Sequence, residues 1–218
     1  MQKMINPSFT RGEYWLLETA VEAAIPICWL DWSDIEEALN KSTHGMSRSL
    51  LIETMHKLFK GGLIVAHRFG NWDDTFEFSP HEIDAALNEK QNKKEHYYQL
   101  TEKGGSYWEA FACPNWNLYI SDGYGLPEDN DIWAGEIVCA NKDHLEGYFR
   151  SLSYHDYDVD ENSIQWDLLE PWKATYWKEL VAGHRIRFRC REKSMDQNYH
   201  IPKPIDQSWY DSLWYNWR

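Results

Sequence analysis

The sequence lacks the patterns by which disulfide frameworks, zinc sites and membrane spans are usually recognised. Its four cysteines lie far apart, and no two have Cys-x-x-Cys spacing. No run of residues approaches the roughly 18 apolar positions that a membrane helix needs, and the amino terminus carries no apolar signal segment. We therefore expect a cytoplasmic protein with free thiols and no membrane partner.

Catalytic motifs are missing as well. There is no glycine-rich phosphate loop and no nucleophile elbow. His144, His155, His184 and His200 are isolated from one another and from any cysteine at ligand spacing. These absences predict a protein that is not an enzyme and that has no cofactor, catalytic residue or metal ligand.

Basic residues are too few to balance the acidic ones, and the formal net charge is −13 over 218 residues. Both halves of the chain contribute to this imbalance. Such a charge repels phosphate backbones and favours encounters with basic proteins. The 13 tryptophans are numerous for this length, and some of them are expected to be surface anchors, because aromatic residues are enriched at protein interfaces.

Helix signals dominate the first part of the chain. Thr10 to Glu13 and Ser33 to Glu36 both have the spacing of a capping box. They predict a first helix from Thr10 to about Ile25, stopped by Pro26, and a short second helix ending near Asn40. A third helix should run from Ser47 to Lys60, followed by a strand over 63–69.

The stretch from Tyr97 to Ala110 indicates a short strand that turns directly into a helix. Tyr98 and Leu100 alternate inward, and Thr101 can cap the helix. The stretch resembles the last strand and closing helix of bacterial winged-helix proteins, whose pattern is tyrosine, leucine, threonine, two variable residues and glycine. The resemblance covers residues 10–112 and implies a winged-helix domain.

The resemblance places the helix 47–60 at the recognition position of the family. Its outward face is mildly basic, and it could meet phosphates or a major groove, or it could simply be a solvated surface. The residues that would contact DNA on the first interpretation are Arg48, Ser49, His56, Lys57 and Lys60.

The wing departs from the family pattern, because about 27 residues separate the two strands where a short hairpin is usual. Ser79-Pro-His-Glu82 predicts a helix from Pro80 to about Asn88 inside this insertion. Carboxylates crowd the segment where a basic wing should follow phosphates, which argues against DNA binding: Asp73, Asp74, Glu77, Glu82, Asp84 and Glu89.

The second half of the chain follows a segment rich in turn-forming residues. We expect a first domain over 1–115, a linker over 116–130 and a second domain over 131–218. Strands are predicted over 133–140 and 184–191, with helices over 141–152 and from Pro171 onward. The fold class expected is therefore α+β, a winged-helix domain with a helical insertion followed by a small α+β domain.

Two charged patterns stand out in the second half. Arg185, Arg187, Arg189 and Arg191 alternate onto one face of a strand, where they could bind an anion or pair with the protein's own carboxylates. The segment 156–167 places aspartates at positions one, three, five and twelve of a calcium loop, but Glu161 stands where that loop needs glycine. A solvated acidic loop with exposed tyrosines, open to a basic partner, is the favoured interpretation.

Two functions remain. The first is an acidic protein-binding module, of the immunity or antitoxin type, that neutralises a basic nuclease-like toxin. The second is a winged-helix DNA-binding transcription regulator with a sensing or dimerisation domain. An aromatic helix over 209–217 either closes the second domain or anchors a partner. On the first interpretation the binding residues are Tyr154, Asp156, Tyr157, Asp158, Asp160, Glu161 and Trp214.

Overall fold

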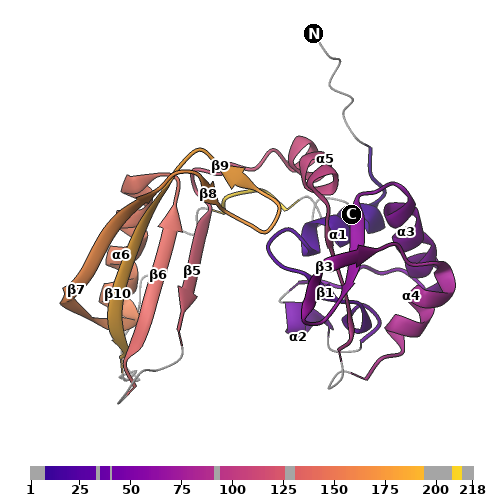
Figure 1. The fold of residues 1–218 in the computed structure, drawn as a ribbon, viewed down its shortest axis with the longest axis horizontal. Coiled ribbons are helices and arrows are strands. Elements are labelled where there is room, and N and C mark those ends of the chain that lie inside the picture. Colours follow the sequence, from indigo (N-terminus) through magenta and orange to yellow (C-terminus); the bar gives the residue numbers. More distant parts are fainter. Residues whose placement is uncertain are drawn as a thin grey trace, which may run out of the picture. The chain divides into compact units, whose positions relative to one another are not determined.

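The computed structural model describes residues 8–32, 35–39, 41–90, 94–125, 131–193 and 208–212. The chain is of the α+β class, as expected, and divides into two compact units (Figure 1). Unit 1 comprises Met1–Cys113, Thr175–Lys178 and Ser212–Arg218, and unit 2 comprises Pro114–Ala174 and Glu179–Asp211. Within the described ranges, no helix combines the length and apolar content that crossing a membrane requires.

The helices of unit 1 begin where the caps predict. Both reciprocal hydrogen bonds of the Thr10–Glu13 capping box are present, Ser47 caps the third helix, and Ser79 and Glu82 form a second capping box. The Ser33 cap lies outside the described residues. The helices are α1 (Arg11–Thr19), α2 (Ile35–Leu39), α3 (Arg48–Lys60), α4 (Pro80–Leu87) and α5 (Glu102–Ala112).

Helix α1 is shorter than predicted, ending at Thr19 instead of near Ile25. The apolar spacing continues through Val21, but Ile25 and Pro26 form strand β1 (Ile25–Pro26), which pairs with Tyr98 and Tyr97. Sheet pairing therefore overrides the helical periodicity. A short 3-10 helix, η1 (Ile27–Trp29), follows directly.

The sheet of unit 1 is antiparallel, in the order β1-β4-β2-β3. Its longer strands are β2 (Ile64–Arg68), β3 (Asn71–Phe76) and β4 (His96–Leu100). Strand β3 was not predicted, because its first five residues are all exposed and the sequence shows no inward alternation there. The insertion between β2 and β4 thus holds an edge strand as well as helix α4.

The core of unit 1 is rich in large aromatic side chains. Trp15, Trp108 and Tyr98 are fully buried, and the Tyr98 hydroxyl donates to the Leu16 carbonyl at 3.1 Å. Thr101 caps α5 as predicted, accepting from the Gly104 amide at 2.9 Å. This confirms the strand-to-helix turn at Thr101.

Four residues from late in the chain, Thr175–Lys178, also belong to unit 1. The Tyr176 hydroxyl accepts from the Leu100 amide at 2.7 Å and donates to the Ala20 carbonyl. The Trp177 indole donates to the Val21 carbonyl at 2.8 Å. These backbone groups lie at the end of β4 and just after α1. The segment 175–178, far away in sequence, therefore provides hydrogen-bond partners for backbone groups that the neighbouring residues leave unpaired.

Unit 2 contains a four-stranded antiparallel sheet, with helix α6 (Lys142–His155) packed on one face (Figure 1). Asn141 caps α6, as predicted. The strand order is β5 (Ile120–Tyr124), β6 (Trp133–Cys139), β10 (Gly183–Glu192) and β7 (Tyr157–Leu169). Strand β5 falls inside the segment that was expected to be a linker, and it pairs with β6.

Two expectations for unit 2 were wrong. The helix expected from Pro171 onward is instead a small pairing of β8 (Trp172–Lys173) with β9 (Glu179–Leu180). The acidic loop expected over 156–167 is largely strand β7. Tyr157 and Val159 pack on the core while Asp158 and Asp160 face outward, which is the two-residue period of a strand.

Candidate functional site

Arg48, at the start of α3, is held by two aspartates of unit 1. Its Nε donates to Asp84 Oδ1 at 2.9 Å, and an Nη donates to the Asp84 carbonyl at 3.0 Å. A further ion pair joins Arg48 to Asp31. Desolvation by itself would lower the pKa of Arg48. The hydrogen bonds and charges of Asp84 and Asp31 raise that pKa by more, so the net shift is upward. Arg48 is therefore a fixed internal contact of unit 1.

The other two cations of the expected DNA face are paired too. Lys57 Nζ lies 2.6 Å from Glu13, and Lys60 Nζ lies 3.2 Å from Glu77. The hydrogen bond and charge of Glu13 raise the pKa of Lys57. His56 Nδ1 lies 3.2 Å from the Phe78 carbonyl, and Ser49 is exposed. All five residues do lie on α3, but the three cations among them have carboxylate partners.

Glu13 links the α1 cap to this face. Burial raises the pKa of the Glu13 carboxyl, but hydrogen bonds from Lys57 and Thr10 lower it more, so the net shift is downward. The Thr10 amide donates to Glu13 at 2.7 Å. One carboxylate thus serves both the capping box and the pairing of α3, a double role that the cap spacing alone did not reveal.

An aromatic cluster on the strands of unit 1 escaped the sequence reasoning. It consists of His67, Phe69, Trp72 and Tyr97. Phe69 and Trp72 are 67% and 47% exposed, whereas His67 is fully buried, its ring centroid 4.3 Å from that of Trp72. Neither ring nitrogen of His67 has a hydrogen-bond partner among the described residues, and burial lowers its pKa. The sequence did carry one signal for this cluster. His67 and Phe69 lie two residues apart in the strand predicted over 63–69, which puts both side chains on the same face.

The acidic residues expected to bind a partner lie around the start of β7. Asp156 is the C-cap of α6, and Asp158 and Glu161 are exposed on the strand. Asp158 Oδ1 is 3.8 Å from Lys193 Nζ. The Asp160 carboxylate accepts from the Asn162 amide at 3.0 Å, where the register with β10 shifts. Asp160 is therefore a structural residue of the bulge as well as an acidic one.

The aromatic members of the expected binding surface differ in their exposure. Tyr154 is 63% exposed. Tyr157 is only partly exposed, packs on the core of unit 2 and stacks on Tyr124 with centroids 5.1 Å apart. Trp214, and most of the aromatic segment 209–217, lies outside the described residues. Of the three aromatic residues proposed, Tyr154 alone is described and largely exposed.

The arginine face of β10 pairs with the protein's own carboxylates, which was one of the two interpretations. Arg185 lies 3.4 Å from Glu136 and 3.1 Å from Asp167, and Arg187 lies 2.8 Å from Asp167. The hydrogen bond from Arg187, with that from Arg185, lowers the pKa of Asp167 despite a desolvation effect in the opposite direction. In register, Arg189 stands opposite Asp160 and Arg191 opposite Asp158.

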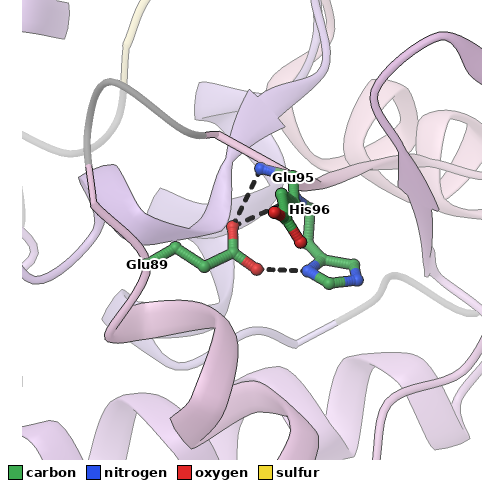
Figure 2. A group of neighbouring side chains, drawn as sticks. All are labelled: Glu89, Glu95 and His96. Atoms are coloured by element: carbon green, nitrogen blue, oxygen red, sulfur yellow. Dashed lines mark hydrogen bonds and ion pairs between the residues drawn. The ribbon is translucent and has the colours of Figure 1, made fainter.

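A second feature that sequence reasoning missed is a group of two carboxylates and an imidazole. Glu89 follows α4, and Glu95 and His96 lie at the start of β4 (Figure 2). Glu89 and His96 also line a hollow of about 480 Å³ beside β3 and α4, together with Asp74, Glu77 and Glu82. The histidines had been assessed by spacing to cysteine, so a site built from glutamates was not considered.

Comparisons with known proteins give no family for this chain. No family model matches it, and neither a curated protein nor a solved structure matches it.

Proposed function

We propose that the chain is a non-enzymatic, acidic protein-binding module that neutralises a basic protein, as an immunity protein or antitoxin neutralises a nuclease-like toxin. The observation that carries the proposal is the pairing of Arg48, Lys57 and Lys60 with carboxylates of unit 1. A helix that contacts DNA needs cations that can replace counterions on phosphates. On α3 those charges are already neutralised within the unit.

Unit 1 is proposed to have a winged-helix fold. The order of α1, α2 and α3 followed by strands supports this, as does the position of β4 between β1 and β2. The same order favours the alternative function, a DNA-binding regulator, because it puts α3 at the recognition position. The exposed edge strand β3 carries Asp73 and Asp74 where a basic wing would be expected, which favours protein contact.

The proposed contact surface is the acidic start of β7. Because β7 is an edge strand of its sheet, one side of its backbone is not paired within the described residues. Asp158 and Glu161 provide negative charge that steers a basic partner, and Tyr154 provides an exposed aromatic contact. Charge thus governs mainly the rate of association, and the aromatic contact governs mainly dissociation.

The test begins with affinity purification of the partner from the native cell by the full chain, followed by binding kinetics with the identified protein. Asp158→Lys with Glu161→Lys should slow association about tenfold and flatten its dependence on salt. Asp160 is left unchanged because it holds the bulge. Tyr154→Ala should mainly speed dissociation.

The matched control is Glu170→Lys with Glu179→Lys, which makes the same change of charge at exposed positions of unit 2 away from the start of β7. This pair should slow association far less. Recovery of DNA alone, or of a partner that responds equally to both pairs and not to Tyr154→Ala, would overturn the proposal.

A further inference from the structure

Glu89 is held in a fixed orientation at the end of α4. Its Oε2 accepts from the backbone amides of Glu95 at 3.0 Å and His96 at 3.1 Å. Its other oxygen, Oε1, faces His96 Nδ1 (Figure 2). The two amides that donate to Oε2 therefore fix the direction of Oε1, which points toward the imidazole nitrogen. Hydrogen bonds from residues outside the coordination shell orient metal ligands in the same way.

The three potential ligand atoms lie close enough together to share one ion. One atom each from Glu89, Glu95 and His96 all fall within 4.8 Å of one another. Ligands bound at about 2.0–2.2 Å to one metal are separated by about 3–4 Å, so small side-chain rotations bring the group into range. Glu95 is exposed, which leaves room for its side chain to rotate.

Lysine and arginine offset only part of the negative charge around this group. Among the described residues, no lysine or arginine forms an ion pair with Glu89 or Glu95. Asp74, Glu77 and Glu82 line the adjoining hollow and add to the negative potential, although Arg68 also lines it and Glu77 pairs with Lys60. Burial raises the pKa of the Cys28 thiol, and the charge of Glu89 adds to this effect while that of Lys94 opposes it.

We propose that Glu89, Glu95 and His96 bind one divalent transition-metal ion, with Zn²⁺ as the representative, and that the ion ties the end of α4 to the start of β4. An imidazole nitrogen with two carboxylate oxygens suits Zn²⁺, Mn²⁺ or Co²⁺ better than Mg²⁺ or Ca²⁺, which prefer all-oxygen sites. The ion takes the place of the Nδ1 hydrogen bond to Glu89, so Nδ1 must present its lone pair and any proton there moves to Nε2 or to solvent.

The inference is tested on the full chain by calorimetric titration with ZnCl₂ and by thermal melting with and without the ion. We expect one Zn²⁺ per chain, micromolar affinity and a higher melting temperature. Glu95→Gln and His96→Gln should each weaken Zn²⁺ binding at least tenfold. Mg²⁺ at the same concentration should leave the melting temperature unchanged.

His81→Gln is the matched control, because His81 is an exposed histidine on α4 and lies outside the group. It should bind Zn²⁺ as the unmodified protein does. Glu95→Gln decides the question even if His96→Gln fails to fold, because the Glu95 side chain is exposed. No Zn²⁺ binding, or binding that persists undiminished in Glu95→Gln, would overturn the proposal.

Discussion

Helices α3 and α5 of unit 1 hold their charged residues and glycines more closely than β7 and α6 of unit 2 do. In unit 1, the cations of α3 have carboxylate partners, and Gly104 packs so closely on Leu63 that an added Cβ would lie 1.9 Å from its carbonyl oxygen. In unit 2, Glu161 is exposed on the edge strand β7, and Gly147 of α6 has nothing within 4 Å of an added Cβ. At these positions, residues of similar type are constrained in unit 1 and open in unit 2, although Arg185 and Arg187 of unit 2 are paired with carboxylates too.

This difference separates structural roles from binding roles. A charged or small residue with close internal partners is explained by folding, and its replacement should act on stability. A charged residue without them is available to another molecule, and its replacement should act on association.

The largest effect on stability is expected when a helical glycine is replaced by alanine, Gly104 in α5 or Gly147 in α6. Gly104→Ala should lower the free energy of unfolding by about 3 kcal/mol, because the new methyl group meets backbone and the helix must move. Gly147→Ala should raise it by about 0.5–1 kcal/mol, since alanine favours helix and nothing obstructs it. Urea unfolding followed by circular dichroism measures both changes. Equal effects of the two substitutions would contradict the comparison.

A smaller effect is expected at Glu13. Glu13→Gln should cost about 1–2 kcal/mol at neutral pH, because the pair with Lys57 is lost and the capping box weakened. The folded-state pKa of Glu13 is lowered, so its contribution is present above the unfolded pKa of about 4.3 and is lost as pH falls through the folded pKa.

The measurement is the free energy of unfolding of both proteins from pH 7 to pH 3. The difference between the unmodified protein and Glu13→Gln should be widest near pH 7 and should shrink below about pH 4. Asp158→Asn is the counterpart in unit 2, and it should change stability by less than about 0.5 kcal/mol, because Asp158 is exposed. A difference that grew toward acid pH would contradict the assignment to Glu13.

Much of the local structure could be predicted from caps. Helices begin as predicted at five residues, and each accepts a cap hydrogen bond from an amide three positions on: Thr10, Ser47, Ser79, Thr101 and Asn141. Where the chain stops being helical was less predictable. The end of α1 depends on the pairing of β1 with Tyr97 and Tyr98, far away in sequence. After Pro171 the chain instead turns back on itself within a few residues, pairing Trp172 with Leu180.

The candidate sites were less accessible to sequence reasoning than the helices. Outward positions on α3 could be read from the helical period, but their partners Asp31, Asp84 and Glu13 come from other elements. The aspartates of 156–167 indicated a solvated acidic loop, and the alternation of Tyr157 and Val159 with them was overlooked. The spacing of residues along the chain does not specify where their side chains point. Whether those side chains meet at one site depends on the tertiary fold.

A weaker effect is expected for DNA. The unmodified protein should not bind duplex DNA appreciably at physiological salt. Replacing Asp31, Asp84 and Glu77 by their amides should free Arg48 and Lys60 and produce weak binding at low salt that falls steeply as salt rises. Fluorescence anisotropy measures both. The control neutralises the exposed residues Glu161, Glu170 and Glu179 of unit 2, and binding that appears equally there would attribute the gain to net charge alone.

The smallest effect is expected for calcium, which should leave the melting temperature unchanged. Asp158 and Asp167 are nine residues apart on β7, and an extended strand rises about 3.3 Å per residue, so they lie far beyond the spacing of ligands held at about 2.3–2.6 Å from one ion, even allowing for the bulge. Asp167 is also engaged by Arg185 and Arg187. Melting curves with millimolar Ca²⁺ and with chelator test this, and a rise of several degrees that Asp158→Asn abolishes would show that these carboxylates converge after all.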